Sequence, residues 1–152
     1  MSPARRRGAT LRVYTDGAAR GNPGPAGAGV HIEDETGAAL DEASLYLGEA
    51  TNNVAEYRAL LLGLERAGTL GAARVEIRAD SELVVRQMTG QYRVRNPALQ
   101  VLHRRARELE RGFERVDYVH VPREQNLAAD RLANRAIDGE RAAPGSPAAG
   151  QS

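Results

Sequence analysis

The chain has 152 residues with a formal net charge of +1, and 41% of them are hydrophobic, which is the balance of an ordinary globular domain with a sizeable core. It contains no cysteine, which excludes a disulfide framework and any thiolate metal site. No apolar stretch approaches the ~20 residues of a membrane span, and no apolar signal-peptide core follows the basic start. We therefore expect a cytoplasmic protein with no membrane partner.

One domain is expected between two tails. Residues 1–9 are predicted to form a disordered basic tail. Residues 139–152 contain mainly Gly, Pro, Ala and Ser without periodicity, which is typical of disorder. The domain is expected to cover residues 10–138, and no internal repeat is visible in it.

The first half of this domain is predicted to hold three strands and a helix. Strands are expected over 10–16, 27–34 and 38–47, the last two joined by the hairpin signal ETG. In the next segment, TNNVAEYRALLLGLERAG, apolar residues recur at i, i+3, i+4 and i+7, which indicates an amphipathic helix. Asn53 is expected to cap the start of this helix, and Gly68 is expected to end it.

Strands and helices alternate in the second half. The segment 73–80 alternates apolar and charged residues, as a half-buried strand does, and the short helix SELVVRQM follows at once. A helix over 97–111, a strand over 113–121 and a helix over 124–138 complete the domain. Three strands in succession predict antiparallel pairing, whereas the later alternation predicts parallel neighbours. The fold class is therefore α/β, with helices on the faces of a mixed sheet.

Four carboxylates stand out by their positions on these elements. Asp16 and Asp80 each end a predicted strand, which is where sites form in open α/β sheets. Glu56 lies in the first turn of a helix, and Asp130 lies beside the apolar stripe of the last helix. Asp16 can instead form a turn before glycine, Glu56 can close a capping box with Asn53, and Asp80 can cap the next helix. Asp130 has no cation at i±3 or i±4, so its partner is a metal ion or a distant arginine.

Four carboxylates from different elements together predict a divalent metal site. Mg²⁺ prefers oxygen ligands and shares its remaining positions with water and phosphate. Two such ions about 3.5–4 Å apart can activate a water and stabilise the leaving oxygen in a phosphodiester displacement. Without metal the carboxylates would repel one another, so metal affinity and site geometry are coupled.

Four sequence blocks carry a family resemblance. These blocks are YTDGAARGNPG, TNNVAEYRALLLGL, IRADSELVV and NLAADRLANRA, and they occur in this order on the predicted elements. Across residues 10–138 the chain resembles type 1 ribonuclease H, in a variant that lacks the basic protrusion. The resemblance implies the ribonuclease H-like fold, a five-stranded mixed sheet of order 3-2-1-4-5 flanked by helices.

The resemblance also implies an activity. It predicts an endoribonuclease that hydrolyses the RNA strand of RNA/DNA hybrids with two Mg²⁺ or Mn²⁺ ions, giving 3′-hydroxyl and 5′-phosphate ends. No obligate protein partner is implied, and we expect a monomer. The family's catalytic and metal-binding carboxylates correspond to Asp16, Glu56, Asp80 and Asp130. By the resemblance, Asp16 and Asp130 hold the ion that orients the attacking water, and Asp16, Glu56 and Asp80 hold the other.

The family's substrate groove corresponds to the glycine-rich segment after Asp16 and to the TNN segment. Unobstructed backbone at glycine permits close approach of nucleic acid, and 2′-hydroxyls distinguish RNA from DNA. Helix capping is the alternative role for the paired asparagines. By the resemblance, the substrate-binding residues are Gly17, Gly21, Asn22, Thr51, Asn52 and Asn53, with Asn22 and Thr51 as phosphate contacts to the DNA strand.

Two departures from the family pattern concern substrate binding. The segment GQYRVRNP leads directly into the next helix where many members carry a basic protrusion, so we expect weaker hybrid binding. Tyr92, Arg93 and Arg95 either supply a reduced contact or form a solvated loop. Glu82 stands where many members have a glutamine that touches a base, which places that contact in doubt.

A third departure concerns a loop histidine that many members carry before the last carboxylate. Here His120 falls inside a predicted strand, and Arg123 is better placed to reach the site. An arginine does not act as a base near neutral pH, so a catalytic role for Arg123 would be electrostatic.

Two alternative functions stay open on the same residues. One is a nuclease of the same fold that acts on double-stranded RNA. The other is a catalytically silent nucleic-acid binding module. The presence of all four carboxylates argues against the silent module, because a binder gains nothing from unpaired acids facing phosphates.

Overall fold

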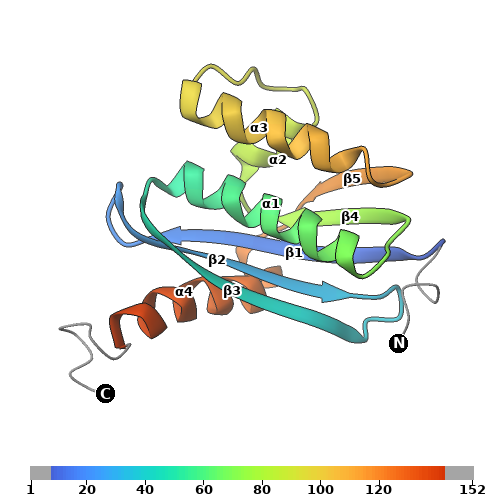
Figure 1. Cartoon of the computed structure of the whole chain (residues 1–152), viewed down its shortest axis with the longest axis horizontal. Coiled ribbons are helices and arrows are strands. Elements are labelled where there is room, and N and C mark those ends of the chain that lie inside the picture. Colours follow the sequence, from blue (N-terminus) through green and yellow to red (C-terminus); the bar gives the residue numbers. More distant parts are fainter. Residues whose placement is uncertain (1–7, 143–152) are drawn as a thin grey trace.

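A computed structural model describes residues 8–142 of the chain (Figure 1). The predicted tail over 1–9 lies mostly outside the described residues, and so do residues 143–152 of the other tail. The last helix continues past residue 138 to Ala142, so the domain extends further than the sequence predicted. The elements are β1 (Thr10–Ala19), β2 (Gly24–Glu33), β3 (Ala39–Ala50), α1 (Asn52–Thr69), β4 (Arg74–Ala79), α2 (Glu82–Met88), α3 (Pro97–Glu110), β5 (Arg115–His120), the 3₁₀ turn η2 (Arg123–Gln125) and α4 (Leu127–Ala142).

The five strands form one mixed sheet in the order β3-β2-β1-β4-β5, which confirms the predicted order. β1 pairs antiparallel with β2, and β2 pairs antiparallel with β3. β4 runs parallel to both β1 and β5. Parallel neighbours need a crossover connection, and here α1 crosses between β3 and β4 while α2 and α3 cross between β4 and β5.

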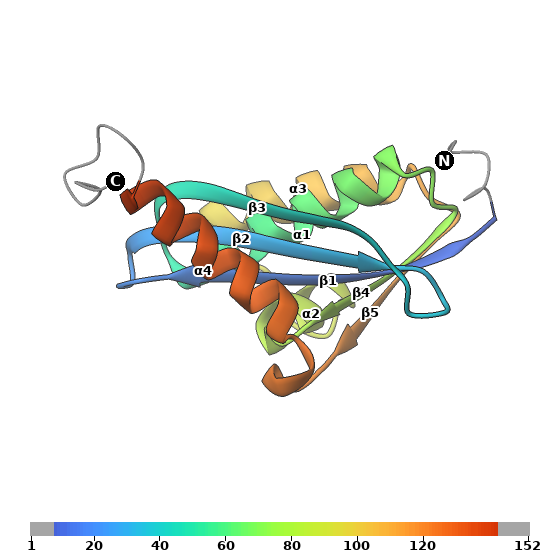
Figure 2. The ribbon, with the colours of Figure 1, turned by 90° about the horizontal axis from the view of Figure 1, so that it is seen from below.

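The main core lies between the sheet and α1. Alternate strand residues such as Val13 and Ile77 are fully buried, and so are Tyr57, Leu60 and Leu64, which recur at helical spacing on α1. α3 packs against α1 on the same side of the sheet (Figures 1 and 2).

α4 covers the opposite face of the sheet, across β2 (Figure 2). Ala129, Leu132, Ala133 and Ile137 form its buried side. Gly29 on β2 permits this close approach, since a Cβ there would lie 2.1 Å from the carbonyl oxygen of Ala129 and 2.5 Å from the amide nitrogen of Ala133. The sheet is thus covered by helices on both faces.

Several boundaries differ from the sequence predictions for local reasons. The cap of α1 is Thr51, whose hydroxyl accepts from the Val54 amide at 3.2 Å, so Asn53 lies inside the helix and its predicted capping role is wrong. α1 also runs through Gly68 to Thr69. β1 continues beyond Asp16 to Ala19 because β2 still pairs with it there. No helix within residues 8–142 is long and apolar enough to cross a membrane.

We predict that Gly29→Ala destabilises the fold by about 1–3 kcal/mol, the usual cost of overpacking. The added methyl would meet the backbone of α4, which cannot move aside as a flexible side chain can. Urea denaturation measures the change in the free energy of unfolding.

Gly139→Ala on α4 is the matched control, because a Cβ there meets nothing within 4 Å. This variant should keep or gain stability, by up to about 1 kcal/mol from helix propensity. Equal stability of the two variants would show that α4 does not pack on β2 at this distance.

Candidate active site

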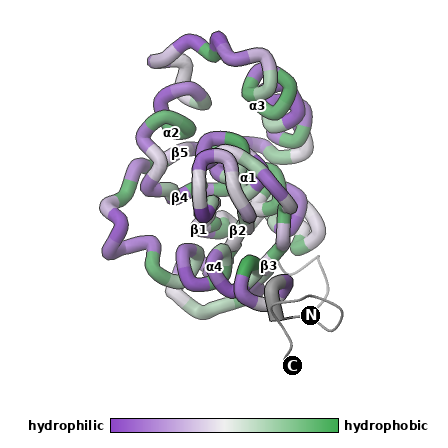
Figure 3. Tube along the Cα trace, turned by 90° about the vertical axis from the view of Figure 1, so that its left-hand side faces the viewer, coloured by the Kyte–Doolittle hydropathy of each residue, from purple (hydrophilic) through white to green (hydrophobic). Residues whose placement is uncertain are grey.

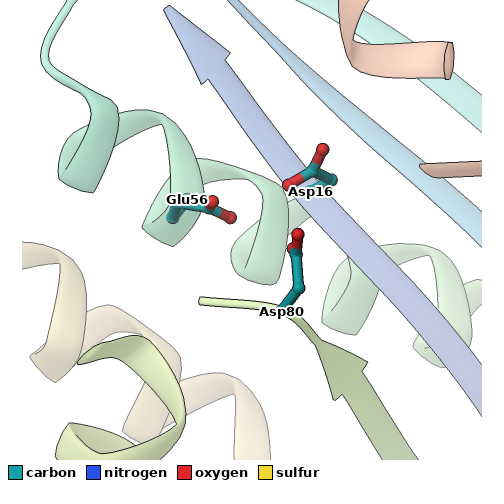
Figure 4. A group of neighbouring side chains, drawn as sticks. All are labelled: Asp16, Glu56 and Asp80. Carbon is teal, nitrogen blue, oxygen red and sulfur yellow. The ribbon is translucent and has the colours of Figure 1, made fainter. Parts of the chain in front are cut away.

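Three carboxylates from three elements converge at the carboxyl ends of β1 and β4. Asp16 lies in β1, Glu56 in α1, and Asp80 directly after β4. One oxygen from each lies within 4.8 Å of the others. Figure 4 shows the three side chains pointing toward one another. The structure thus brings together three of the four predicted ligands.

The sheet register places two of these residues side by side. The parallel ladder between β1 and β4 ends at the pair Thr15 and Ala79, so Asp16 and Asp80 are the next residues on neighbouring strands. Asp16 is 5% exposed and lies in a strand, which rules out its alternative role as a turn former. Ser81 caps α2 by accepting from the Val84 amide at 3.3 Å, so Asp80 is not the cap.

Glu56 reaches the cluster because α1 passes very close to β1. A Cβ on Gly17 would lie 2.2 Å from the backbone carbonyl carbon of Ala55, so only glycine fits there. The Gly17 amide donates to the Glu56 carboxylate at 3.0 Å. The capping-box alternative for Glu56 is therefore wrong, since its carboxylate is held by the strand and not by the helix start.

Burial and mutual repulsion raise the pKa values of two of these acids. Burial is the largest cause at Asp16, followed by the charges of Glu56 and Asp80, and together they raise its pKa from 3.8 to about 10. Burial, partly opposed by the hydrogen bond from Gly17, raises the pKa of Glu56 from 4.5 to about 8. Without a cation the cluster therefore retains protons at neutral pH.

Asp130 lies next to this cluster and contributes to the raised pKa of Asp16. Its carboxylate is 3.9 Å from the guanidinium of Arg123, which lies in η2 and is 75% exposed at its side chain. Asn134 also donates to it at 3.4 Å. Of the two partners left open by the sequence, the distant arginine is present, and its exposure leaves Asp130 accessible to a further ligand.

Sequence reasoning missed Asn126, which joins the parts of the site. This residue is 1% exposed, and its side-chain amide donates to the Thr15 carbonyl at 2.9 Å and to the Asp80 carboxylate at 3.1 Å. Its backbone carbonyl accepts from the Asp130 amide at 3.1 Å. In the sequence, this position stood out only as the first residue of the NLAAD block. Its neighbours in the sequence do not indicate contacts with β1 and with Asp80 after β4.

The predicted substrate-binding residues fall into two groups. Asn22 and the TNN segment line one pocket of about 410 Å³ together with Asn96, the cap of α3, which the sequence did not single out. Within this pocket, the side-chain oxygen of Asn22 accepts a hydrogen bond from the backbone amide of Asn52 at 3.0 Å. Gly17 packs under α1, and Gly21 lies in the turn after β1 with a φ of +107°.

Two further predicted positions are also placed. His120 is exposed and lies in a strand, as predicted, although β5 ends at this residue and not at residue 121. The Glu82 carboxylate accepts from Arg86 at 2.7 Å, an i,i+4 ion pair on α2 that offsets its added charge.

Comparison with known proteins identifies the family. The Reverse transcriptase-like family model matches residues 14–136. Ribonuclease HI of Halobacterium salinarum is 46% identical over 132 residues, covering 87% of this chain and 66% of that protein. Ribonuclease H of Halorhodospira halophila is 37% identical over 145 residues, covering 84% of this chain and 93% of that protein. The chain belongs to the ribonuclease H family.

Solved ribonuclease H structures share the fold at similar identity. The crystal structure of LC11-RNase H1 in complex with RNA/DNA hybrid matches with a TM-score of 0.82 and 48% identity, covering 86% of this chain and 98% of that chain. The chain spans 35% of the length of the mycobacterial relatives that it also matches. The ribonuclease H fold is therefore established for this domain.

The acidic cluster suits the divalent cations on which ribonucleases H depend. All of its donors are carboxylate oxygens, which hard cations prefer, and a bound cation would offset the repulsion that raises the pKa values. No arginine forms an ion pair with the three clustered carboxylates in the described part of the chain, so no arginine competes there with an external cation. These residues therefore fit a metal site.

We predict that the free energy of unfolding in chelator falls as the pH rises from about 4 toward 8. The folded pKa values of Asp16 and Glu56 lie above their usual values, so the folded chain retains protons that the unfolded chain releases. This contribution to stability is fully present below the unfolded pKa values of 3.8 and 4.5. It is lost as the pH rises through the folded values of about 8 for Glu56 and about 10 for Asp16. Urea denaturation across pH measures it.

Asp16→Asn removes the largest of these shifts and should be more stable than the parent in chelator at about pH 8. Excess Mg²⁺ should restore the parent and not this variant. Asp117→Asn, an exposed carboxylate on β5, is the control. A parent whose stability in chelator rises with pH would contradict the electrostatics described above.

We predict that Asn126→Asp lowers turnover by roughly 10–100-fold, the usual effect of removing a partner of a metal ligand. The change replaces a donor to Asp80 with an acidic oxygen and leaves the shape intact. Activity measured across metal concentrations should show a higher metal requirement.

Gln91→Glu is the control, since it also replaces an amide with an acid, and Gln91 is an exposed residue whose side-chain oxygen accepts from Arg86 and contacts none of the four carboxylates. It should change the metal requirement much less. Identical metal titrations for the two variants would show that Asn126 does not support metal binding at Asp80.

Proposed function

We propose that this chain is a metal-dependent endoribonuclease that cleaves the RNA strand of RNA/DNA hybrids. The observation that carries the proposal is the convergence of Asp16, Glu56 and Asp80 within 4.8 Å, beside Asp130, in a ribonuclease H domain. A relative at 48% identity is known in complex with such a hybrid. The products are a 3′-hydroxyl and a 5′-phosphate.

The four carboxylates have separate tasks in this proposal. Asp16 is the central ligand, shared between an ion held with Glu56 and Asp80 and an ion held with Asp130. When bound, Mg²⁺ or Mn²⁺ lowers the pKa of a coordinated water and offsets the charge on the leaving oxygen. Its ligands must be deprotonated, so metal binding is coupled to the release of the protons that the cluster retains.

Neighbouring residues hold these ligands in place. The Gly17 amide fixes the carboxylate of Glu56, and Asn126 fixes that of Asp80. Carboxylates that are already fixed need little rearrangement when the metal ions bind. A metal-assisted displacement requires this precise placement of its ligands. Arg123 is proposed to act by charge alone, because it stays protonated and lies 3.9 Å from Asp130.

The substrate is proposed to lie along the pocket next to the cluster. Asn22 and the residues Thr51, Asn52 and Asn53 line it, at the amino-terminal end of α1. Amide side chains and helix amino termini both suit phosphate contacts. Gly17 and Gly21 form the adjoining backbone, so the family's substrate groove is proposed to follow this surface.

We predict that the protein cleaves end-labelled RNA/DNA hybrid in Mg²⁺ or Mn²⁺ and not in chelator. Asp80→Asn should lower turnover by more than about 100-fold, because even partners of metal ligands contribute 10–100-fold. Asp117→Asn removes the same charge from exposed β5 and should retain full activity.

Matched single-stranded RNA, double-stranded RNA and double-stranded DNA set the breadth of the activity. Strong cleavage of double-stranded RNA would favour the nuclease alternative. Metal-independent hybrid binding with no cleavage of any substrate would identify a silent binding module and contradict the proposal.

A further inference from the structure

A positively charged groove lies beyond α2, outside the acidic cluster. It has a volume of about 610 Å³ and lies between residues 90–94 and one side of α3. We call it the arginine groove, and the residues that matter here are Tyr92, Arg93, Gln100, His103, Arg104 and Arg107.

The charge of this groove is not neutralised from within. None of its lining residues is acidic. Arg107 is paired with Glu110 at 2.9 Å and donates to the Met88 carbonyl at 2.7 Å. Arg93 and Arg104 are exposed and form no ion pair within residues 8–142. Two guanidinium groups therefore face solvent from opposite walls of one concave surface.

Hydrogen bonds from α2 and α3 hold the segment that carries Arg93. The Gln87 side chain donates to the Arg93 carbonyl at 3.3 Å and accepts from the buried Tyr57 hydroxyl at 2.7 Å. Gln100 on α3 donates to the Val94 carbonyl at 3.0 Å. These contacts fix the walls of the groove relative to α1, so binding would cost little ordering entropy.

The rim adds an aromatic group. Tyr92 is 46% exposed, and the Arg86 guanidinium carbon lies 5.6 Å from its ring centroid. Arginine and tyrosine together are typical of surfaces that contact the phosphate–sugar backbone of nucleic acids. An isolated surface arginine would not suggest such a ligand, whereas a fixed groove with two unpaired arginines does.

The position of the groove relates it to the acidic cluster. Asp80 lies just before α2, and Gln87 and Gly90 of the groove lie at its other end. The seven residues of α2 span about 10 Å between the two sites. Figure 3 looks onto this end of the molecule, with the hydrophilic segment between α2 and α3 above β4, β1 and α4.

We propose that the arginine groove is a second nucleic-acid contact, where Arg93 and Arg104 bind backbone phosphates other than the one attacked at the carboxylates. This inference rests on the proposed function. Of the two roles left open for the segment around Tyr92 and Arg93, it favours the substrate contact over the solvated loop. The contact is formed by residues 90–94 together with α3.

The test compares two double variants of equal charge. Arg93→Ala/Arg104→Ala removes the two arginines of the groove that form no ion pair. Arg111→Ala/Arg115→Ala removes two other exposed arginines, which follow the carboxyl end of α3. Hybrid binding is measured in chelator across salt concentrations, and cleavage is measured in Mg²⁺. Thermal unfolding confirms that both variants are folded.

The groove variant should lower the salt slope of binding by about 1.8, since each phosphate contact contributes about 0.9. Over a fourfold rise in salt, its disadvantage in Kd relative to the parent should shrink by roughly tenfold. Its KM should rise with kcat unchanged, because the groove does not touch the reacting atoms. The control should keep the parent's slope.

Equal salt slopes and equal KM values for the two double variants would overturn the inference. Failure of the proposed function has a different appearance, because the parent itself would not cleave hybrid. The slopes measured in chelator still test the groove in that case, since they do not depend on cleavage.

Discussion

The close approach of three carboxylates, one buried and two half-buried, is the constraint on which this structure depends. Asp16 is 5% exposed and has two other acids within 4.8 Å, with no arginine paired to them in the described chain. Such a cluster is costly unless protons or cations offset its charge. The raised pKa values of Asp16 and Glu56 express that cost. A site that must otherwise hold protons is ready to exchange them for metal.

The rest of the fold maintains this unfavourable arrangement. Gly17 brings α1 against β1 so that Glu56 reaches the cluster, and Gly29 brings α4 against β2 on the other face. Asn126 then joins β1, the end of β4 and the first turn of α4 through hydrogen bonds of 2.9–3.1 Å. α1 on one face of the sheet and α4 on the other are thereby held in place around the acidic cluster. The acids stay close because the packing of the whole domain opposes their separation.

Periodicity predicted the elements well, since the spacing of Tyr57, Leu60 and Leu64 or the alternation in β4 is a local property. The four blocks also identified the family and its carboxylates. The partners of those carboxylates were mispredicted or missed. Glu56 is held by Gly17, which lies 39 positions away, and Asn126 contacts Thr15 across 111 positions. Local rules offered a capping box as the alternative role of Glu56, because they consider only residues three or four positions away. For the arginine groove, the sequence left Tyr92 and Arg93 open between a substrate contact and a solvated loop, and it did not single out Arg104, because α3 and the preceding segment form the groove jointly.

Calorimetric titration with Mn²⁺, in buffers of different ionisation enthalpy, tests the central claim most directly. Binding to the parent near neutral pH should release protons, because the buried acids hold them in the metal-free chain, and Asp16→Asn should lose most of this release together with affinity. Binding without proton release, or equal binding by the parent and the variant, would contradict the claim that Asp16 and Glu56 hold protons until a cation replaces them.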